Sequence, residues 1–253
     1  KSAGFVFAVT PSNWVAAEAD GVQPLFWAAL DEADARDEQH DFHFASVDQS
    51  RYTVMFFTDL HLTNSSEKRD LDHYRSIALA SISDEAAQAS ARGPVYSLNL
   101  GDLSHDLYWY QYDFDVSSAK RFLEQNGFPT LLYSIPGNHD NDPYVADDFE
   151  SENPWRENLG PTYYSFDIGD IHYIQLDNTL FTNTGGAQGT VGKLDYTEGL
   201  TADQLRWLEA DLQRVPAEKT VFVGMHIQFT NRYRIADGKL SWSYAMPADC
   251  RAK

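Results

Sequence analysis

The sequence predicts an α/β fold that begins near residue 51, and two observations support this. From Arg51 onward, short segments rich in β-branched and aromatic residues alternate with segments whose apolar residues recur at helical spacing. The first fifty residues lack that alternation. Because 253 residues can bury a large core, we expect residues 51–253 to form the main domain and residues 1–50 to be a separate segment.

The N-terminal segment contains one predicted strand and one charged stretch. Residues 5–10 are mostly apolar and predict a strand, whereas residues 31–41 are crowded with charge and predict a solvated loop or a short helix. Residues 1–50 are therefore interpreted as a linker or as the tail of an upstream module.

The main domain begins with a predicted strand and helix. Residues 52–58 are mostly β-branched or aromatic, which favours a strand. Asp70 can cap the following helix, whose apolar residues share one face: Leu71, Tyr74, Ala78 and Ile82. Gly93 and Pro94 should end that helix.

Residues 95–100 and 130–135 predict the second and third strands. The segment between them contains a predicted helix over 116–126, which Gly127 would close.

A predicted hairpin follows, with strands at 162–167 and 172–176 joined by Gly169 and Asp170, a pair typical of tight turns. His172 lies inside an aromatic strand and is expected to be a packed core residue.

The last predicted elements are a helix and a strand. Thr201 and Gln204 predict a capping box at the start of the helix, and its buried stripe would be Leu205, Leu208 and Leu212. Residues 220–224 predict the strand.

The composition excludes several classes of protein. Acidic residues outnumber basic ones 38 to 19, and a formal charge of −19 would repel a polyanion, so nucleic acid is not an expected partner. No apolar run approaches the roughly 20 residues that cross a bilayer. The single cysteine, Cys250, excludes an internal disulfide and a multi-cysteine zinc site. A metal ion would need His, Asp, Glu or Asn ligands.

Metal-binding residue types follow four of the predicted strands, at the point where each strand ends. In open α/β sheets, ligand sites form at this edge. The residues are Asp59 and His61 after the first strand, Asp102 after the second, Asn138 and His139 after the third, and His226 after the last.

These residues lie in the motifs Asp59-Leu60-His61, Gly101-Asp102, Gly137-Asn138-His139-Asp140 and Gly224-Met225-His226. In this order and spacing, the chain resembles the calcineurin-like metallophosphoesterases, whose signature is DxH, GDxxD, GNHD or GNHE, a lone His, and GHxH. A fixed tetrapeptide such as GNHD is expected by chance on the order of once in 10⁵ positions. Taken singly, Asp and Asn after strands are typical of turns and helix caps, so the order of the motifs carries the resemblance.

The resemblance implies a β-sandwich core flanked by helices, in four layers α/β/β/α, with a site for two divalent metal ions. Asp59 and His61 would hold the first metal ion, and Asn138 and His226 the second, with Asp102 bridging them. This ligand set suits Mn, Fe or Zn better than Ca.

The implied activity is hydrolysis of a phosphoester bond, mono- or diester, in a small-molecule substrate. A hydroxide activated by both metal ions would attack phosphorus. His139 would give a proton to the leaving group and is not an expected metal ligand.

The chain departs from the family pattern after Asp102. His105 stands where GDxxD has its second Asp, which commonly pairs with the catalytic His, and Asp106 comes one residue later. The catalytic candidate is Asp106, which would turn inward and take the role of the second Asp. The alternative is that His105 approaches a metal ion, since related purple acid phosphatases have a Tyr ligand at this spacing. We favour a supporting role for one of the two, outside the ligand set.

A larger departure is at the end of the sequence, where no His follows His226 and the GHxH motif is absent. We expect the domain over 51–253 to be C-terminally incomplete, a fragment that binds metal weakly or is inactive. The alternative function is a catalytically inactive module of this fold that binds a glycan or a protein partner.

Residues 160–178 are similar to a subgroup of calcineurin-superfamily phosphohydrolases of Bacteroides-like bacteria. In that subgroup, small β-rich domains flank the catalytic core. The resemblance therefore implies that residues 1–50 are the tail of an upstream β-rich module with its linker, and that the protein is exported to the periplasm or cell envelope.

An acidic run follows the third motif, and most of it is interpreted as a solvated face. Its members are Asp140, Asp142, Asp147, Asp148 and Glu150. Asp140 is the exception, because directly after the motif it can brace the loop through backbone hydrogen bonds.

Overall fold

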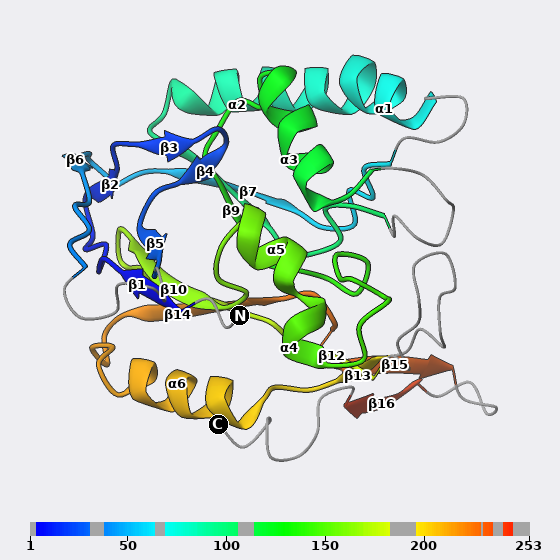
Figure 1. Ribbon diagram of the computed structural model, residues 1–253. Helices are drawn as coiled ribbons and strands as arrows, with labels where there is room; N and C mark the ends of the chain where they lie inside the picture. The colour runs from blue at the N-terminus through cyan, green and yellow to red at the C-terminus, as the bar shows by residue number, and fades with distance from the viewer. Residues whose placement is uncertain are drawn as a thin grey trace.

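The computed structural model describes seven stretches of the chain (Figure 1). They are residues 4–30, 38–63, 69–105, 114–182, 196–228, 230–234 and 240–244.

Two three-stranded sheets form the centre of the molecule. The first is parallel throughout, in the order β7 (Thr53–Phe57), β8 (Val95–Asn99) and β9 (Leu132–Ser134). The second has the order β10 (Tyr164–Ile168), β11 (Ile171–Leu176) and β14 (Thr220–Met225). β10 pairs antiparallel with β11, and β11 pairs parallel with β14. Each of these strands was predicted, and the predicted hairpin is confirmed.

Aromatic side chains from both sheets pack against one another and form one cluster. Tyr133 of β9 stacks on Phe166 of β10 with ring centroids 4.1 Å apart, and Phe166 stacks on Tyr173 of β11 at 5.4 Å. Tyr96 and Leu98 of β8 are buried in the same cluster. The sheets therefore face each other across a largely aromatic core.

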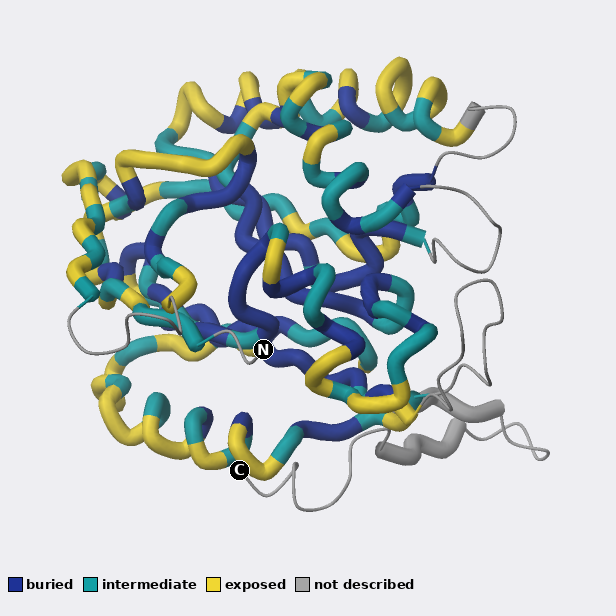
Figure 2. The backbone as a smooth tube through the Cα atoms, in the orientation of Figure 1, coloured by how far each residue is buried: buried dark blue, intermediate teal, exposed yellow. Residues whose placement is uncertain are grey.

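Helices cover the outer faces of the two sheets (Figure 1). The first sheet is covered by α1 (Arg69–His73), a π-helical segment (Tyr74–Ala78), α2 (Leu79–Ser90) and α3 (Val116–Gln125). Next to α3, α5 (Asn153–Asn158) and α4 (Asp148–Ser151) lie at the side of the two sheets (Figure 1). The second is covered by α6 (Ala202–Leu212), whose Leu208 packs with Ile174 of β11. Burial follows this arrangement in part, since β8, β9, β10 and β11 are mostly buried, β7 and β14 are more exposed, and the helices expose their outer sides (Figure 2).

Short antiparallel strand pairs complete the described fold. At the N-terminus β1 (Phe5–Phe7) pairs with β5 (Trp27–Ala29), and β2 (Trp14–Ala16) pairs with β6 (Phe44–Ser46). Between them, β3 (Ala19–Asp20) pairs with β4 (Gln23–Pro24). Later in the chain β12 (Thr179–Phe181) pairs with β13 (Tyr196–Glu198), and β15 (Thr230–Arg234) with β16 (Leu240–Tyr244).

The N-terminal segment lies against the core. The backbone N–H of Leu132 in β9 donates to the carbonyl oxygen of Val22 at 2.8 Å. Val22 is buried in the cluster under the first helices and Phe26 in the cluster between the sheets. A domain boundary near residue 50 stays a prediction, and residues 31–37 of the predicted charged loop lie outside the described residues.

The predicted helix starts are partly right. Asp115 caps α3 by accepting from the N–H of Ser118 at 2.9 Å. Asp70 does not cap α1, because this helix already begins at Arg69. Thr201 caps α6 by accepting from the N–H of Gln204 at 3.1 Å. A capping box would also have the Gln204 side chain bond back to the N–H of Thr201. In its place, the Gln204 side chain accepts from the N–H of Asp177 and donates to its carbonyl oxygen.

The α/β class is confirmed, whereas the four-layer order stays a prediction for the domain as a whole. Over the described residues, no helix is long and apolar enough to cross a membrane.

Candidate metal centre

The loops after β7 and β8 run side by side beyond the ends of their strands. The N–H of Asp59 donates to the carbonyl of Gly101 at 3.0 Å, and that of His61 to the carbonyl of Asp102 at 2.9 Å. These bonds bring Asp59, His61 and Asp102 to one edge of the sheet. The backbone pairing, which continues the parallel ladder, therefore positions three of the predicted ligands.

Asp102 is the most central of the predicted ligands and is only 2% exposed. Its Oδ1 accepts the backbone N–H of His139 at 2.9 Å. Its Oδ2 faces three imidazoles, with the Nε2 atoms of His226, His61 and His139 at 3.3, 3.6 and 3.9 Å. Burial alone would raise the pKa of Asp102, but the hydrogen bond and charge of His226 hold that pKa below its usual value.

His226 follows β14 and is oriented by the backbone of the neighbouring sheet. Its Nδ1 lies 3.0 Å from the carbonyl oxygen of Leu100, and its Nε2 lies 3.0 Å from Oδ1 of Asn138. Burial would lower the pKa of His226, but the hydrogen bond and charge of Asp102 raise it above the usual value. All five predicted metal ligands are thus brought together.

Three of these residues have an unfavourable backbone conformation. Asp59, His61 and Asp102 have φ of 54°, 45° and 54°. Asn13 is the only other non-glycine residue with positive φ in the described stretches. Such conformations cost about 1–3 kcal/mol each and gather at functional sites, so their concentration here marks this edge of the sheet as the site.

Glycines in two of the motifs make room for the ligands. Gly101 has φ of +107°, and a Cβ there would lie 2.6 Å from Nδ1 of His226. A Cβ on Gly137 would lie 2.2 Å from Oδ1 of Asp102. Only glycine therefore allows the three loops to approach this closely.

Asp140 braces two of these loops, as predicted. It is 2% exposed, and its carboxylate accepts from the N–H of Leu103 at 3.1 Å, from the N–H and hydroxyl of Ser104 at 2.8 Å each, and from the N–H of Gly137 at 3.0 Å. Burial and repulsion from Asp102 raise the pKa of Asp140 to about 6, against the lowering effect of these donors. Asp140 therefore does not belong to a solvated face, although Asp147 and Glu150 are exposed.

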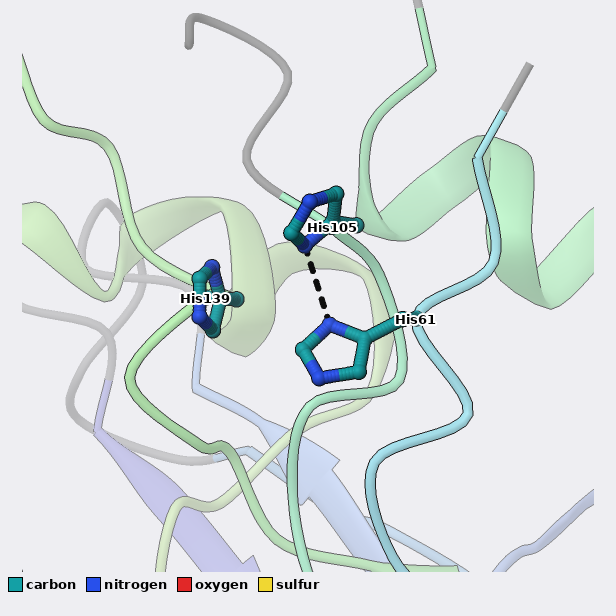
Figure 3. Close-up of side chains that lie close together, drawn as sticks. All are labelled: His61, His105 and His139. Carbon is teal, nitrogen blue, oxygen red and sulfur yellow. Dashed lines mark hydrogen bonds between the residues drawn. The ribbon is translucent and has the colours of Figure 1, made fainter. Parts of the chain in front are cut away.

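His105 lies beside the candidate ligands, in a group of three imidazoles with His61 and His139 (Figure 3). Its Nδ1 is 3.0 Å from Nδ1 of His61, and its ring centroid is 4.7 Å from that of His61 and 4.8 Å from that of His139. Burial, then repulsion from His139 and His61, lowers the pKa of His105. Asp106, the catalytic candidate beside it, lies outside the described residues.

The side chains at this edge fit a divalent metal ion. Over the described residues, two groups of three have ligand atoms within 4.8 Å of one another: Asp59, His61 and Asp102, and His61, His105 and His139. Carboxylate and imidazole together are typical ligands of Mn, Fe and Zn. His226 adjoins the first group through Asp102, and Asn138 in turn contacts His226.

Asn178 supports the site and is not among the residues predicted for it. Its side chain is fully buried, donates to the carbonyl of Ile227 at 2.7 Å and accepts the N–H of Ile227 at 2.9 Å. It thereby fixes the backbone next to His226. Its position two residues after β11, at the same edge of the sheet, is the signal that could have indicated it.

The chain belongs to the calcineurin-like phosphoesterase family, whose model matches residues 52–245. A comparison with curated proteins found no match. The family implies metal-dependent hydrolysis of phosphoric esters, although its members can be inactive. The likeness to the Bacteroides-like subgroup stays a prediction.

Proposed function

We propose that this protein hydrolyses phosphoester bonds with two divalent metal ions bound at the shared edge of its sheets. The observation that carries this proposal is the environment of Asp102, whose buried carboxylate lies among the imidazoles of His226, His61 and His139. The family membership supports the same reaction class.

In this proposal Asp59 and His61 would hold one metal ion, Asn138 and His226 would hold the other, and Asp102 would supply the carboxylate shared by the two sites. Mn, Fe and Zn are the candidate metals. Ions bound there would activate a water molecule for attack on phosphorus and would neutralise the phosphoryl oxygens.

His139 is the proposed general acid. Its backbone is held by the bond from its N–H to Asp102, and its side chain is 27% exposed, so the imidazole can reach both the site and a bound substrate. An imidazolium near neutral pH can donate its proton to the departing alkoxide. Asp106, proposed as its partner, lies outside the described residues.

The proposed substrate is a small phosphoester, because a formal charge of −19 repels polyanions while bound cations reverse the field locally. Both mono- and diesters fit the proposal. Export to the periplasm or cell envelope is proposed on the resemblance of residues 160–178 alone.

The test is hydrolysis of para-nitrophenyl phosphate and of bis(para-nitrophenyl) phosphate by the full chain with Mn²⁺. We expect turnover of at least one ester, at a low rate because no GHxH imidazoles follow His226, and we expect Asp102→Asn to reduce it to background because the variant loses the central carboxylate. Asp170→Asn is the matched control, since Asp170 is exposed in the turn between β10 and β11 and should leave the rate unchanged.

Full activity in Asp102→Asn would overturn the site assignment. Absence of bound metal and of turnover, both in this chain and in the full-length protein, would favour the alternative function, a binding module for a glycan or protein partner.

A further inference from the structure

The two histidines proposed as metal ligands are anchored differently, and His226 has the simpler arrangement. Its Nδ1 faces the carbonyl oxygen of Leu100 at 3.0 Å. A carbonyl only accepts, so Nδ1 of His226 carries a proton, and with a cation bound Nε2 would be the unprotonated ligand atom. Nε2 is the atom that faces Asn138 and Asp102.

His61 also turns its Nε2 toward carboxylates, with Oδ1 of Asp59 at 3.5 Å and Oδ2 of Asp102 at 3.6 Å. Its Nδ1 meets the Nδ1 of His105 at 3.0 Å, the bond drawn dashed in Figure 3. The Nδ1 atom of His105 therefore faces Nδ1 of His61 in the way that the carbonyl oxygen of Leu100 faces Nδ1 of His226.

The protons in this pair can be assigned for the metal-bound state. A cation bound at Nε2 of His61 requires that nitrogen to be unprotonated, so the single proton of the neutral ring lies on Nδ1. That N–H must donate to His105, whose Nδ1 must then be unprotonated and whose own proton lies on Nε2. Ligand histidines generally donate their second ring N–H in this way, which fixes ring orientation and strengthens the metal bond.

The backbone places His105 so that this bond can form. Leu62 donates to the carbonyl of Leu103 at 3.0 Å and forms a parallel bridge with Ser104, so the two loops stay paired up to the residue before His105. Ser104 is in turn held by the Asp140 carboxylate. The pairing of the two loops therefore holds His105 next to His61.

We propose that His105 is a positioning residue that accepts a hydrogen bond from Nδ1–H of His61 and so holds Nε2 of His61 toward the metal ion. The inference rests on the proposed function, because it assigns His61 to the metal centre. His105 itself does not bind the metal ion in this arrangement.

Two substitutions separate this role from direct metal binding. In His105→Asn, the Oδ1 atom lies where Nδ1 was and can still accept, whereas His105→Leu has no acceptor. We expect His105→Leu to weaken Mn²⁺ or Zn²⁺ binding, measured by titration calorimetry on the full chain, by roughly 10- to 100-fold. His105→Asn should keep most of the affinity, and His43→Leu, at an exposed position, should match the unaltered chain.

A second measurement uses the unaltered chain and therefore does not depend on the variants folding. In the Zn²⁺-loaded protein, ¹⁵N NMR of the imidazoles should show His61 protonated at Nδ1, with a coupling across the hydrogen bond to Nδ1 of His105. Protonation of His61 at Nε2, or absence of that coupling, would overturn the proposal.

Equal loss of affinity in His105→Asn and His105→Leu would also overturn it, in favour of direct ligation through the ring. Unchanged affinity in both variants, or absence of metal binding by the unaltered chain, would overturn it too. If the unaltered chain binds metal and hydrolyses esters but His105→Leu behaves normally, only this inference fails. If metal binding depends on His105 as expected but no ester is hydrolysed, only the proposed function fails.

Discussion

Among single residues, Asp140 shows how a side chain outside the ligand set can decide the geometry of the site. Its carboxylate joins the loop after β8 to the loop after β9 through four hydrogen bonds. Each loop carries predicted ligands, Asp102 in the first and Asn138 in the second. The spacing between those predicted ligands therefore depends on a residue outside the proposed ligand set.

Asp140→Asn should destabilise the protein. An amide offers one acceptor oxygen instead of two and turns its NH₂ group toward N–H donors that then lack a partner. Leaving buried donors unpaired costs about 1–3 kcal/mol each, so we expect a loss of that order in the free energy of unfolding, measured by urea denaturation at pH 8. Asp170→Asn, the same change at an exposed turn, should alter it by less than about 0.5 kcal/mol. Equal stability of the two variants would contradict the bracing role.

Between elements, a charged network fastens α6 to the β10–β11 hairpin. His172 of β11 lies between two carboxylates, with its Nδ1 2.7 Å from Asp167 of β10 and its Nε2 2.8 Å from Asp211 of α6. The Lys219 ammonium also contacts Asp167. Burial would lower the pKa of His172, but the hydrogen bonds and charges of Asp167 and Asp211 raise that pKa to about 9. The expected packed core residue is thus buried, but as an imidazolium in an ion network.

This network predicts a pH dependence of stability. The folded-state pKa of His172 lies above its unfolded value of 6.5, so its stabilisation is complete below pH 6.5 and is lost as the pH rises through about 9. The loss should be on the order of 2 kcal/mol after allowance for solvent screening. Urea denaturation of His172→Gln, compared with the unaltered chain at pH 6 and pH 9.5, should show a stability difference that shrinks at the higher pH. A constant difference would contradict the assignment, and His43→Gln serves as the exposed control.

For the whole molecule, the candidate ligands come from the ends of strands in both sheets, so a metal ion would tie the sheets together. Asp59, His61, Asp102 and Asn138 follow strands of the first sheet, while His226 follows β14 of the second. A ligand that binds only the native state stabilises it by mass action.

Metal binding should therefore raise the thermal stability of the full chain. At 100 times the dissociation constant of Mn²⁺, the gain should be about 2.7 kcal/mol, visible as a higher midpoint in differential scanning calorimetry and reversed by EDTA. In Asp102→Asn the shift should be much smaller. A midpoint independent of Mn²⁺ in the unaltered chain would contradict metal binding across the sheets.

Much of the fold could be predicted because its elements have local causes. The strands at β7 and β14 follow from runs of β-branched and aromatic residues, and the cap of α6 follows from Thr201. The order of the motifs likewise placed the predicted ligands at strand ends. These features depend on residues close together in sequence.

Features set by tertiary contacts could not be predicted in the same way. The Gln204 side chain leaves the capping box because a better partner, the Asp177 backbone, lies 27 positions away. The contact between His61 and His105, 44 positions apart, depends on how two loops pair beyond their strands. The short helix α4 overlaps the end of the acidic run and α5 comes just after it, and the local pattern of that run does not distinguish a helix from a solvated loop.

The order of the candidate ligands along the chain has a consequence for biosynthesis. Asp59 to His139 are translated well before β14 and His226, and β14 reaches its place only by pairing with β11. Pairing over such sequence separations is slow relative to local contacts. We therefore expect a metal ion to be loaded at this edge late in maturation, after β14 has paired with β11 and both sheets have formed.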